Sequence, residues 1–250
     1  MQKFQKLRLL LNRIQNKLLA EYRTLTKPSL VKLEGIAIRV DPYFSEPIRA
    51  SIYRGHYEAD EMKIVKSHLF PNDIVMEIGA GIGLISSYCA KKIGSERVFT
   101  YEANPELETH IRETYKLNSV FPTLEICLVG DRPGEETFYI EKNFWSSSIT
   151  PWNQNARSVK VPVKSFNEEV RRINPSFLIM DVEGGEYDIL KNADFYNIQK
   201  LAIELHEKLI GSEKVQFVKA KLDEAGFQVN KNFYGRQKVG LEQLFWERLK

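Results

Sequence analysis

The chain has 250 residues, enough for one sizeable α/β domain with a small extension. Hydrophobic residues make up 43% and charged residues 28%, as in ordinary globular proteins, and a net charge of +3 gives no reason to expect a nucleic-acid partner. No apolar run approaches the roughly 18 residues of a membrane span. The two cysteines lack C-x-x-C spacing, so we expect free thiols and a reducing, cytoplasmic compartment.

The N-terminus predicts an amphipathic helix from residue 3 to about residue 22. Its apolar stripe has alternating spacings of three and four, at Phe4, Leu7, Leu11, Ile14 and Leu18. Cations surround this stripe, at Lys3, Lys6, Arg8, Arg13 and Lys17, and no acid occurs before Glu21. Such a helix can dock on its own domain, pair with a second copy in a homodimer, or lie on an anionic membrane. We assign residues 1–50 to an N-terminal extension and residues 51–250 to the main domain.

Strands and helices then alternate along the main domain. Short strands are predicted at 31–33 and 36–40, then a loop with Pro42 and Pro47, a helix at 58–69, and an antiparallel pair at 137–141 and 159–163. The main strands are predicted at 74–78, 98–102, 124–129, 177–180, 201–205, 227–230 and 244–246, with a helix at 212–225. This order predicts an α/β fold: a Rossmann-like, doubly wound, mainly parallel seven-stranded sheet with an antiparallel edge strand.

A glycine-rich turn follows the first main strand. The run Ile74–Ile78 contains Glu77, and Gly79, Gly81 and Gly83 follow at alternate positions before a predicted helix. Glycines at a strand–helix turn let the backbone approach a ligand closely. A dinucleotide loop would need its third glycine at Leu84, and the carboxylate of Glu77 would repel phosphates. The pattern therefore favours a cationic ligand, although an ordinary tight turn would also explain it.

Acidic residues end two further strands. Glu102 closes 98–102 and is placed to accept the two hydroxyls of a ribose, while Asn104 and Pro105 are suited to begin a helix. Asp181 follows 177–180 and opens the segment Asp181-Val182-Glu183-Gly184-Gly185-Glu186. In an open α/β sheet ligands bind at the carboxyl ends of the strands, so we expect Glu77, Glu102 and Asp181 at one crevice.

Five segments together resemble the FkbM family of S-adenosylmethionine-dependent O-methyltransferases over about residues 50 to 230. They are Glu77-x-Gly-x-Gly-x-Gly, Tyr101-Glu102-Ala103-Asn104-Pro105, Trp145-Ser-Ser-Ser, Asp181-Val182-Glu183-Gly184 and Glu204-Leu205-His206. The family often has Asp-x-Gly-Ala-Asn in the first motif, where this chain has Glu77 and Gly81. The resemblance implies that S-adenosylmethionine is the cofactor and that a hydroxyl of a carbohydrate, glycolipid or other small molecule is the acceptor.

On this resemblance the cofactor would be bound by the first two motifs and Asp181. These residues are Glu77, Gly79, Ala80, Gly81, Gly83, Glu102, Ala103, Asn104 and Asp181. Asp181, Glu183 and His206 would act in catalysis, with Asp181 and His206 as candidate bases that remove the hydroxyl proton. A hard-cation site made by Asp181, Glu204 and His206 is the alternative, and neither spacing nor residue type compels a divalent metal.

The acceptor is expected to contact Tyr57, Trp145, Ser147 and Glu204, because aromatic faces and hydroxyls suit a sugar ring. Packing of Trp145 against the sheet, and a polar loop around Tyr57, are equally compatible with the sequence. Two other functions remain open at this stage. One is a non-catalytic interaction protein that retains the fold, and the other is an NAD(P)-dependent oxidoreductase, which the glycine spacing disfavours.

Overall fold

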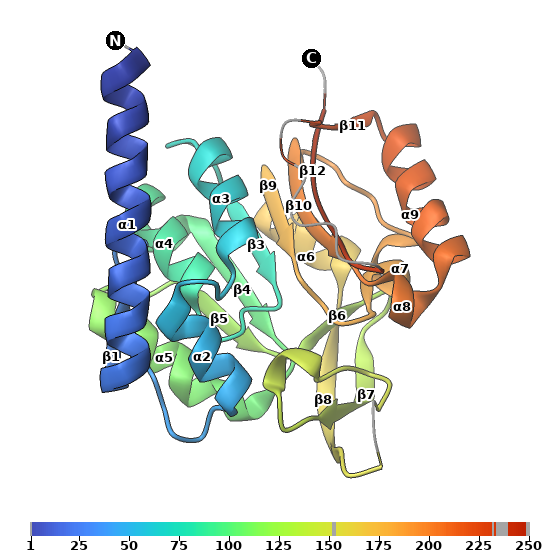
Figure 1. Cartoon of the computed structure of the whole chain (residues 1–250). Coiled ribbons are helices and arrows are strands. Elements are labelled where there is room, and N and C mark those ends of the chain that lie inside the picture. Colours follow the sequence, from blue (N-terminus) through green and yellow to red (C-terminus); the bar gives the residue numbers. More distant parts are fainter. Residues whose placement is uncertain (1, 152–153, 232, 234–239, 249–250) are drawn as a thin grey trace.

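The computed structural model describes residues 2–151, 154–231, 233 and 240–248 of the chain (Figure 1). Its centre is a seven-stranded sheet in the order β11-β12-β10-β9-β3-β4-β5. The strands are β3 (Val75–Ile78), β4 (Val98–Glu102), β5 (Thr123–Ile126), β9 (Phe177–Met180), β10 (Lys200–Leu205), β11 (Phe227–Val229) and β12 (Glu242–Arg248). Pairing is parallel from β10 to β5, whereas β12 runs antiparallel to both β10 and β11. The predicted seven-stranded α/β sheet is confirmed, with the antiparallel strand lying one position inside the edge strand β11.

Helices cover both faces of this sheet. One face carries α2 (Glu46–Arg54), α3 (Ala59–His68), α4 (Leu84–Ile93) and α5 (Glu108–Asn118), and the other carries α6 (Phe166–Ile173), α7 (Glu186–Leu190) and α9 (Ser212–Glu224) (Figure 1). A four-residue helix, α8 (Glu207–Ile210), follows β10. Both cysteines are buried and free, as predicted.

Alternation along the strands decides which side chains share a face. Phe177 and Ile179 of β9 pack under the α2–α5 layer, while Leu178 and Met180 pack under the other layer. Side chains of a strand point to opposite faces in turn, so Asp181 continues the α2–α5 side. The same parity holds for Glu77 in β3 and Glu102 in β4. The acids at the strand ends therefore lie on one face because their positions in the strands have the same parity.

Two predicted elements are wrong. The segment with Pro47 is helix α2 rather than a loop, because a proline near the first helical position starts a helix without losing a hydrogen bond. The predicted strand 124–129 is two strands, β5 and β6 (Leu128–Gly130), which belong to different sheets. The backbone N–H of Cys127 donates to the carbonyl of Glu102 at 2.9 Å where the chain leaves the main sheet.

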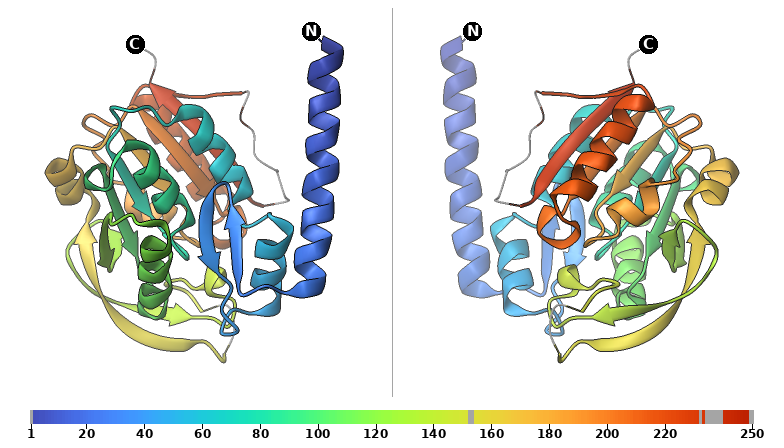
Figure 2. Two further views of the ribbon diagram at one scale, coloured as in Figure 1. Left: turned by 90° about the vertical axis from the view of Figure 1, so that its left-hand side faces the viewer. Right: turned by 90° about the vertical axis from the view of Figure 1, so that its right-hand side faces the viewer.

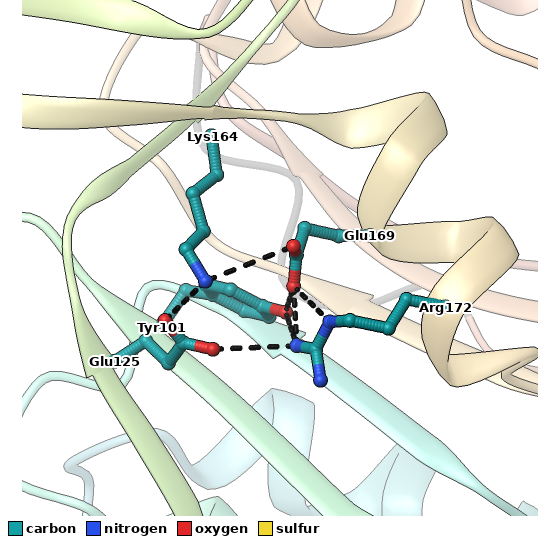
Figure 3. A network of polar contacts seen from close by, with 5 residues as sticks. All are labelled: Tyr101, Glu125, Lys164, Glu169 and Arg172. Carbon is teal, nitrogen blue, oxygen red and sulfur yellow. Dashed lines mark hydrogen bonds and ion pairs between the residues drawn. The ribbon is translucent and has the colours of Figure 1, made fainter.

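A second, three-stranded sheet stands beside the carboxyl ends of β4 and β5. It contains β6, β8 (Arg157–Ser165) and β7 (Gly134–Ile140), and the β7–β8 pairing confirms the antiparallel pair predicted from the sequence. A network of polar contacts ties this sheet to the main one (Figure 3). The hydroxyl of Tyr101 on β4 donates to Glu169 on α6, and Arg172 bridges Glu169 and Glu125. Lys164 of β8 pairs with the same two carboxylates.

The N-terminal residues form helix α1 (Gln2–Thr26), a hairpin of β1 (Leu30–Leu33) and β2 (Ile36–Arg39), and then α2. Apolar side chains of the hairpin and α2, such as Ile36, Ile38 and Ile48, join the core cluster under α4 and α5. Helix α1 instead stands beside the domain and extends away from it (Figure 2). Leu18 on the predicted stripe is 61% exposed, and Leu11 and Ile14 are exposed as well. The side chains of Phe4 and Leu7 lie outside the described part, and no helix in that part is long and apolar enough to cross a membrane.

Candidate active site

A cavity of about 1320 Å³ opens at the carboxyl ends of the main strands. Its walls come from the glycine turn after β3, the ends of β4, β9 and β10, the start of α3, and the small sheet with the segment around Trp145. Two sets of polar residues face it. We call Gly79, Gly81 and Glu102 the glycine-loop group, and Asp181, Glu204 and His206 the Asp181 group.

The glycine turn is held tightly against the neighbouring strand ends. Gly79 has φ +91°, and a Cβ placed on it would lie 1.9 Å from the carbonyl oxygen of Asp181. Gly81 has φ +54°, and a Cβ there would lie 2.4 Å from the hydroxyl oxygen of Tyr57. Both positions favour glycine for their conformation, and Gly79 also requires it for space because the neighbouring atom belongs to the backbone. The backbone of the turn is thereby brought close to Asp181 on one side and Tyr57 on the other.

Glu102 anchors this turn from β4. One carboxylate oxygen accepts from the N–H of Gly81 at 3.0 Å, and the other accepts from the N–H of Asn104 at 2.8 Å. Burial raises the pKa of Glu102 to about 7, although these backbone N–H groups oppose the rise. A carboxylate has about four acceptor positions, so the side chain still has capacity for hydroxyls of a ligand.

Glu77 lies beneath the turn and does not line the cavity. Its carboxylate accepts from the N–H of Ser86 at 3.0 Å, near the start of α4, and burial raises its pKa to about 7. Ala80, Gly83 and Asn104 also lie outside the cavity wall. Asn104 caps the short helix after β4, because its side-chain oxygen accepts from the N–H of Glu106. The cap inferred from the sequence is confirmed, and direct cofactor contact by these four residues stays a prediction.

The Asp181 group is assembled from two adjacent strands. The register places Ile203 beside Met180, so that Glu204 comes next to Asp181. One ligating atom from each of Asp181, Glu204 and His206 lies within 4.8 Å of the others. The Oδ1 atom of Asp181 is buried and has no hydrogen-bond partner among the described residues. Burial raises the pKa of Asp181 well above its usual value, and the nearby Glu204 carboxylate adds to the rise.

His206 is 6% exposed and lies between carboxylates. Its Nδ1 is 2.5 Å from Oε1 of Glu186, its Nε2 is 3.3 Å from Glu183, and Nε2 is 3.8 Å from Glu204. Burial alone would lower the pKa of His206, but the hydrogen bonds to Glu183 and Glu186 raise it to about 11. A pKa raised in this direction disfavours the predicted role of His206 as a base.

Two buried carboxylates near the site were not identified from the sequence. Glu61 of α3 lines the cavity and is 6% exposed, and burial together with the Asp181 carboxylate raises its pKa well above the usual value. Glu186 is fully buried at the start of α7. Sequence gives no signal for either role, because an acid on an amphipathic helix or in a first helical turn is usually exposed.

The residues predicted to contact an acceptor all line the same cavity. Tyr57 lies over the glycine turn, and Trp145 is partly buried against the core cluster of the α2–α5 side. The hydroxyl oxygen of Ser147 accepts from the N–H of Glu141 at 3.0 Å, so this side chain is held by its own segment. Trp152, which is near this segment in the sequence, lies outside the described residues. Ala103 and Glu183 are also in the cavity wall.

Comparison with known families now identifies the domain. The model of the methyltransferase FkbM domain matches residues 77–229, which include the glycine turn and both groups of cavity residues. The chain belongs to the FkbM methyltransferase family. The resemblance seen in the sequence is thereby confirmed, and the class is that of S-adenosylmethionine-dependent methyltransferases. This assignment excludes the oxidoreductase that the sequence left open.

The chain is also similar to individual proteins, in sequence to one named methyltransferase and in structure to solved ones. A protein of Methanocaldococcus jannaschii named "Putative protein N5-glutamine methyltransferase" is 36% identical over 91 residues, which is 36% of this chain and 41% of that protein. The tRNA (uracil-54, C5)-methyltransferase of Pyrococcus abyssi, solved with S-adenosyl-L-homocysteine, has a TM-score of 0.51 at 11% identity, covering 88% of this chain and 44% of that one. The precorrin-6y C5,15-methyltransferase of Geobacter metallireducens has a TM-score of 0.47 at 14% identity, covering 77% and 88%. The likeness to the Pyrococcus abyssi structure is one of fold alone.

Proposed function

We propose that this FkbM-family protein transfers a methyl group from S-adenosylmethionine to a hydroxyl of a carbohydrate, glycolipid or small natural product. The observation that supports it is the position of the Asp181 group. These residues lie in the same cavity as Glu102, at the carboxyl ends of β9 and β10, so a cofactor at the glycine-loop group would present its methyl group toward acidic side chains.

The glycine-loop group fits the cofactor. Glu102 projects a carboxylate into the cavity, where it can accept both hydroxyls of the cofactor's ribose. Close packing of Gly79 and Gly81 against their neighbours brings backbone, instead of side chains, to this wall. Surrounding carboxylates favour a ligand that carries an ammonium and a sulfonium, and they disfavour the pyrophosphate of a dinucleotide.

The chemistry needed from the protein is alignment and removal of one proton. The acceptor oxygen forms a bond to the methyl carbon while the carbon–sulfur bond breaks, and the electron pair stays on sulfur to give S-adenosylhomocysteine. The hydroxyl proton passes to a carboxylate of Asp181 or of the adjacent Glu183. Because burial raises the pKa of Asp181, its carboxylate is a better proton acceptor than an exposed aspartate. Alignment of oxygen, methyl and sulfur supplies much of the remaining rate enhancement.

The acceptor lies, in this proposal, between Trp145, Tyr57 and Glu204. An aromatic face beside hydroxyl and carboxylate groups suits a ring that bears several hydroxyls.

Methyl transfer to a panel of acceptors tests the proposal. Purified full-length protein is incubated with S-adenosylmethionine and either hydroxylated acceptors (monosaccharides, glycolipids, macrolides) or a glutamine-containing peptide, and products are identified by mass spectrometry. We expect a mass gain of one methyl group at a hydroxyl. Methylation of the glutamine amide alone would overturn the hydroxyl acceptor. S-adenosylhomocysteine binding without any methylated product would favour the non-catalytic alternative.

A further inference from the structure

The Asp181 group has the composition and spacing of a cation site. It combines the carboxylate of the residue after β9, a carboxylate of β10 and the imidazole of the residue after β10, with one ligating atom from each within 4.8 Å of the others. Two ligands on one divalent ion, each at about 2.1–2.4 Å, can be no farther apart than about 4.2–4.8 Å. The side chains therefore need little movement to share one ion.

His206 is oriented as a metal-binding histidine is. Its Nδ1 is 2.5 Å from Oε1 of Glu186, and Glu186 is 0% exposed, so the ring is fixed from behind by a fully buried carboxylate. The other nitrogen, Nε2, faces the carboxylates of Glu183 and Glu204. A carboxylate on one ring nitrogen that orients the other toward an ion is the usual outer contact of metal-bound histidines.

The surrounding charges also favour a cation. Asp181 Oδ1 is buried and has no hydrogen-bond partner among the described residues. Glu58 and Glu61 of the α3 segment face the same cavity, and Glu183 adds a further carboxylate. Carboxylates gathered close together repel one another, and a cation held between them offsets this repulsion.

We infer that Asp181, Glu204 and His206 bind one divalent cation of the Mn²⁺ or Mg²⁺ class, and that its open positions take hydroxyl oxygens of the acceptor. Oxygen-rich sites with one imidazole suit these ions. A bound hydroxyl loses its proton more readily, and three protein ligands leave room for two neighbouring hydroxyls. The inference rests on the proposed hydroxyl acceptor for its purpose and on the three side chains alone for its geometry.

The test is direct binding of Mn²⁺ to full-length protein that has been freed of metal with a chelator. Free Mn²⁺ is followed by electron paramagnetic resonance, with no acceptor and no methyl transfer in the assay. We expect one Mn²⁺ per chain, with affinity reduced at least about tenfold in His206→Asn and in Glu204→Gln, and by a similar factor in Glu186→Gln. The control is Glu113→Gln, which removes a carboxylate of α5 that pairs with Arg39 outside the cavity and should leave the affinity unchanged.

Retained stabilisation by S-adenosylhomocysteine shows that each variant is folded. Absence of Mn²⁺ binding in the parent protein, or equal binding in the parent, His206→Asn and Glu204→Gln, would overturn the cation site. If hydroxyl methylation then persists in the presence of chelator, the proposed function holds without the cation site. Mn²⁺ binding as expected, together with methylation only of an amide, would instead keep the site and overturn the hydroxyl acceptor.

Discussion

The two groups of cavity residues hold carboxylates of the same kind in different surroundings. At the glycine-loop group, both oxygens of Glu102 accept backbone N–H groups, so its position is fixed before any ligand arrives. At the Asp181 group, Asp181 Oδ1 has no hydrogen-bond partner among the described residues and lies among other acids. The first arrangement suits a carboxylate that holds a ligand, and the second suits one that binds a cation or takes up a proton. Neighbouring backbone thus separates two roles that the residue types alone do not distinguish.

The largest effect is expected from Asp181→Asn. The amide keeps the shape but removes the negative charge, so turnover should fall about 10²-fold or more while affinity for S-adenosylhomocysteine is retained. Steady-state kinetics on the acceptor found in the panel, with calorimetry for the cofactor product, measure the two quantities separately. Near-parental turnover in this variant would show that Asp181 is not needed for methyl transfer, and the proposed functional difference between the two groups would be wrong.

The complementary change is Glu102→Ala, which should act on binding. Loss of the ribose acceptor is worth about 2–3 kcal/mol, so S-adenosylhomocysteine affinity should fall by tens of times. Turnover at saturating cofactor should change much less than in Asp181→Asn. Because Glu102 also holds the N–H of Gly81, Glu102→Gln is the milder companion, since its side-chain oxygen can keep one of these contacts. Unchanged affinity by calorimetry would refute the assignment of Glu102.

A smaller effect is expected from pH. The pKa of Glu102 is about 7 in the folded protein, above its ordinary value of 4.5, because burial penalises the charged form. Between these values the folded chain holds a proton that the unfolded chain has lost, so this group's contribution to stability falls as pH rises through the window. Ligand affinity should move the other way, since the ionised carboxylate is the better acceptor. We expect S-adenosylhomocysteine to bind about tenfold more tightly near pH 8 than near pH 5.5.

Glu102→Gln is the control for this pH dependence, because an amide does not titrate in that range. Calorimetry at the two pH values should show a smaller change of affinity in Glu102→Gln than in the parent protein. An equal change in both would assign the titration to another group, of which Glu77 is the nearest candidate, with its pKa also raised to about 7 by burial.

The sequence predicted the glycine-loop group better than the Asp181 group. Glu102 follows a strand whose apolar pattern is plain, so its strand-end position and its cavity face are both fixed by the two-residue period of the strand. The surroundings of His206 depend on packing between distant segments. Glu186 contacts His206 from twenty residues earlier in the chain, and Glu61 of α3 interacts electrostatically with Asp181. Neither interaction leaves a local pattern in the sequence. The break at Cys127 was also hidden, because the apolar residues continue through it from β5 into β6.

The smallest effect on turnover and on cofactor affinity is expected from removing most of α1. No described residue of α1 lines the cavity, so deletion of residues 1–18 should leave turnover on a soluble acceptor and cofactor affinity unchanged. The deletion stops before Arg23, whose guanidinium donates to the carbonyl of Lys32 at 2.8 Å, and so keeps the contact of α1 with the hairpin. Altered turnover on a soluble acceptor would show that α1 influences the cavity.

Deletion of residues 1–18 should instead abolish binding of the protein to a surface. Leu11, Ile14 and Leu18 are exposed, so this part of the stripe is not docked on its own domain. Two such helices would bring like charges together, because the first 17 residues carry five cations around the stripe and no acid. We therefore expect the helix to bind anionic membranes, where each Lys or Arg near the surface adds about 1 kcal/mol.

Full-length protein should sediment with phosphatidylserine vesicles. Neither the deletion nor the triple change Lys6→Glu, Arg13→Glu, Lys17→Glu should do so. The charge changes keep the apolar stripe, so a dimer in light scattering that survives them and is lost only on deletion would assign the helix to pairing instead.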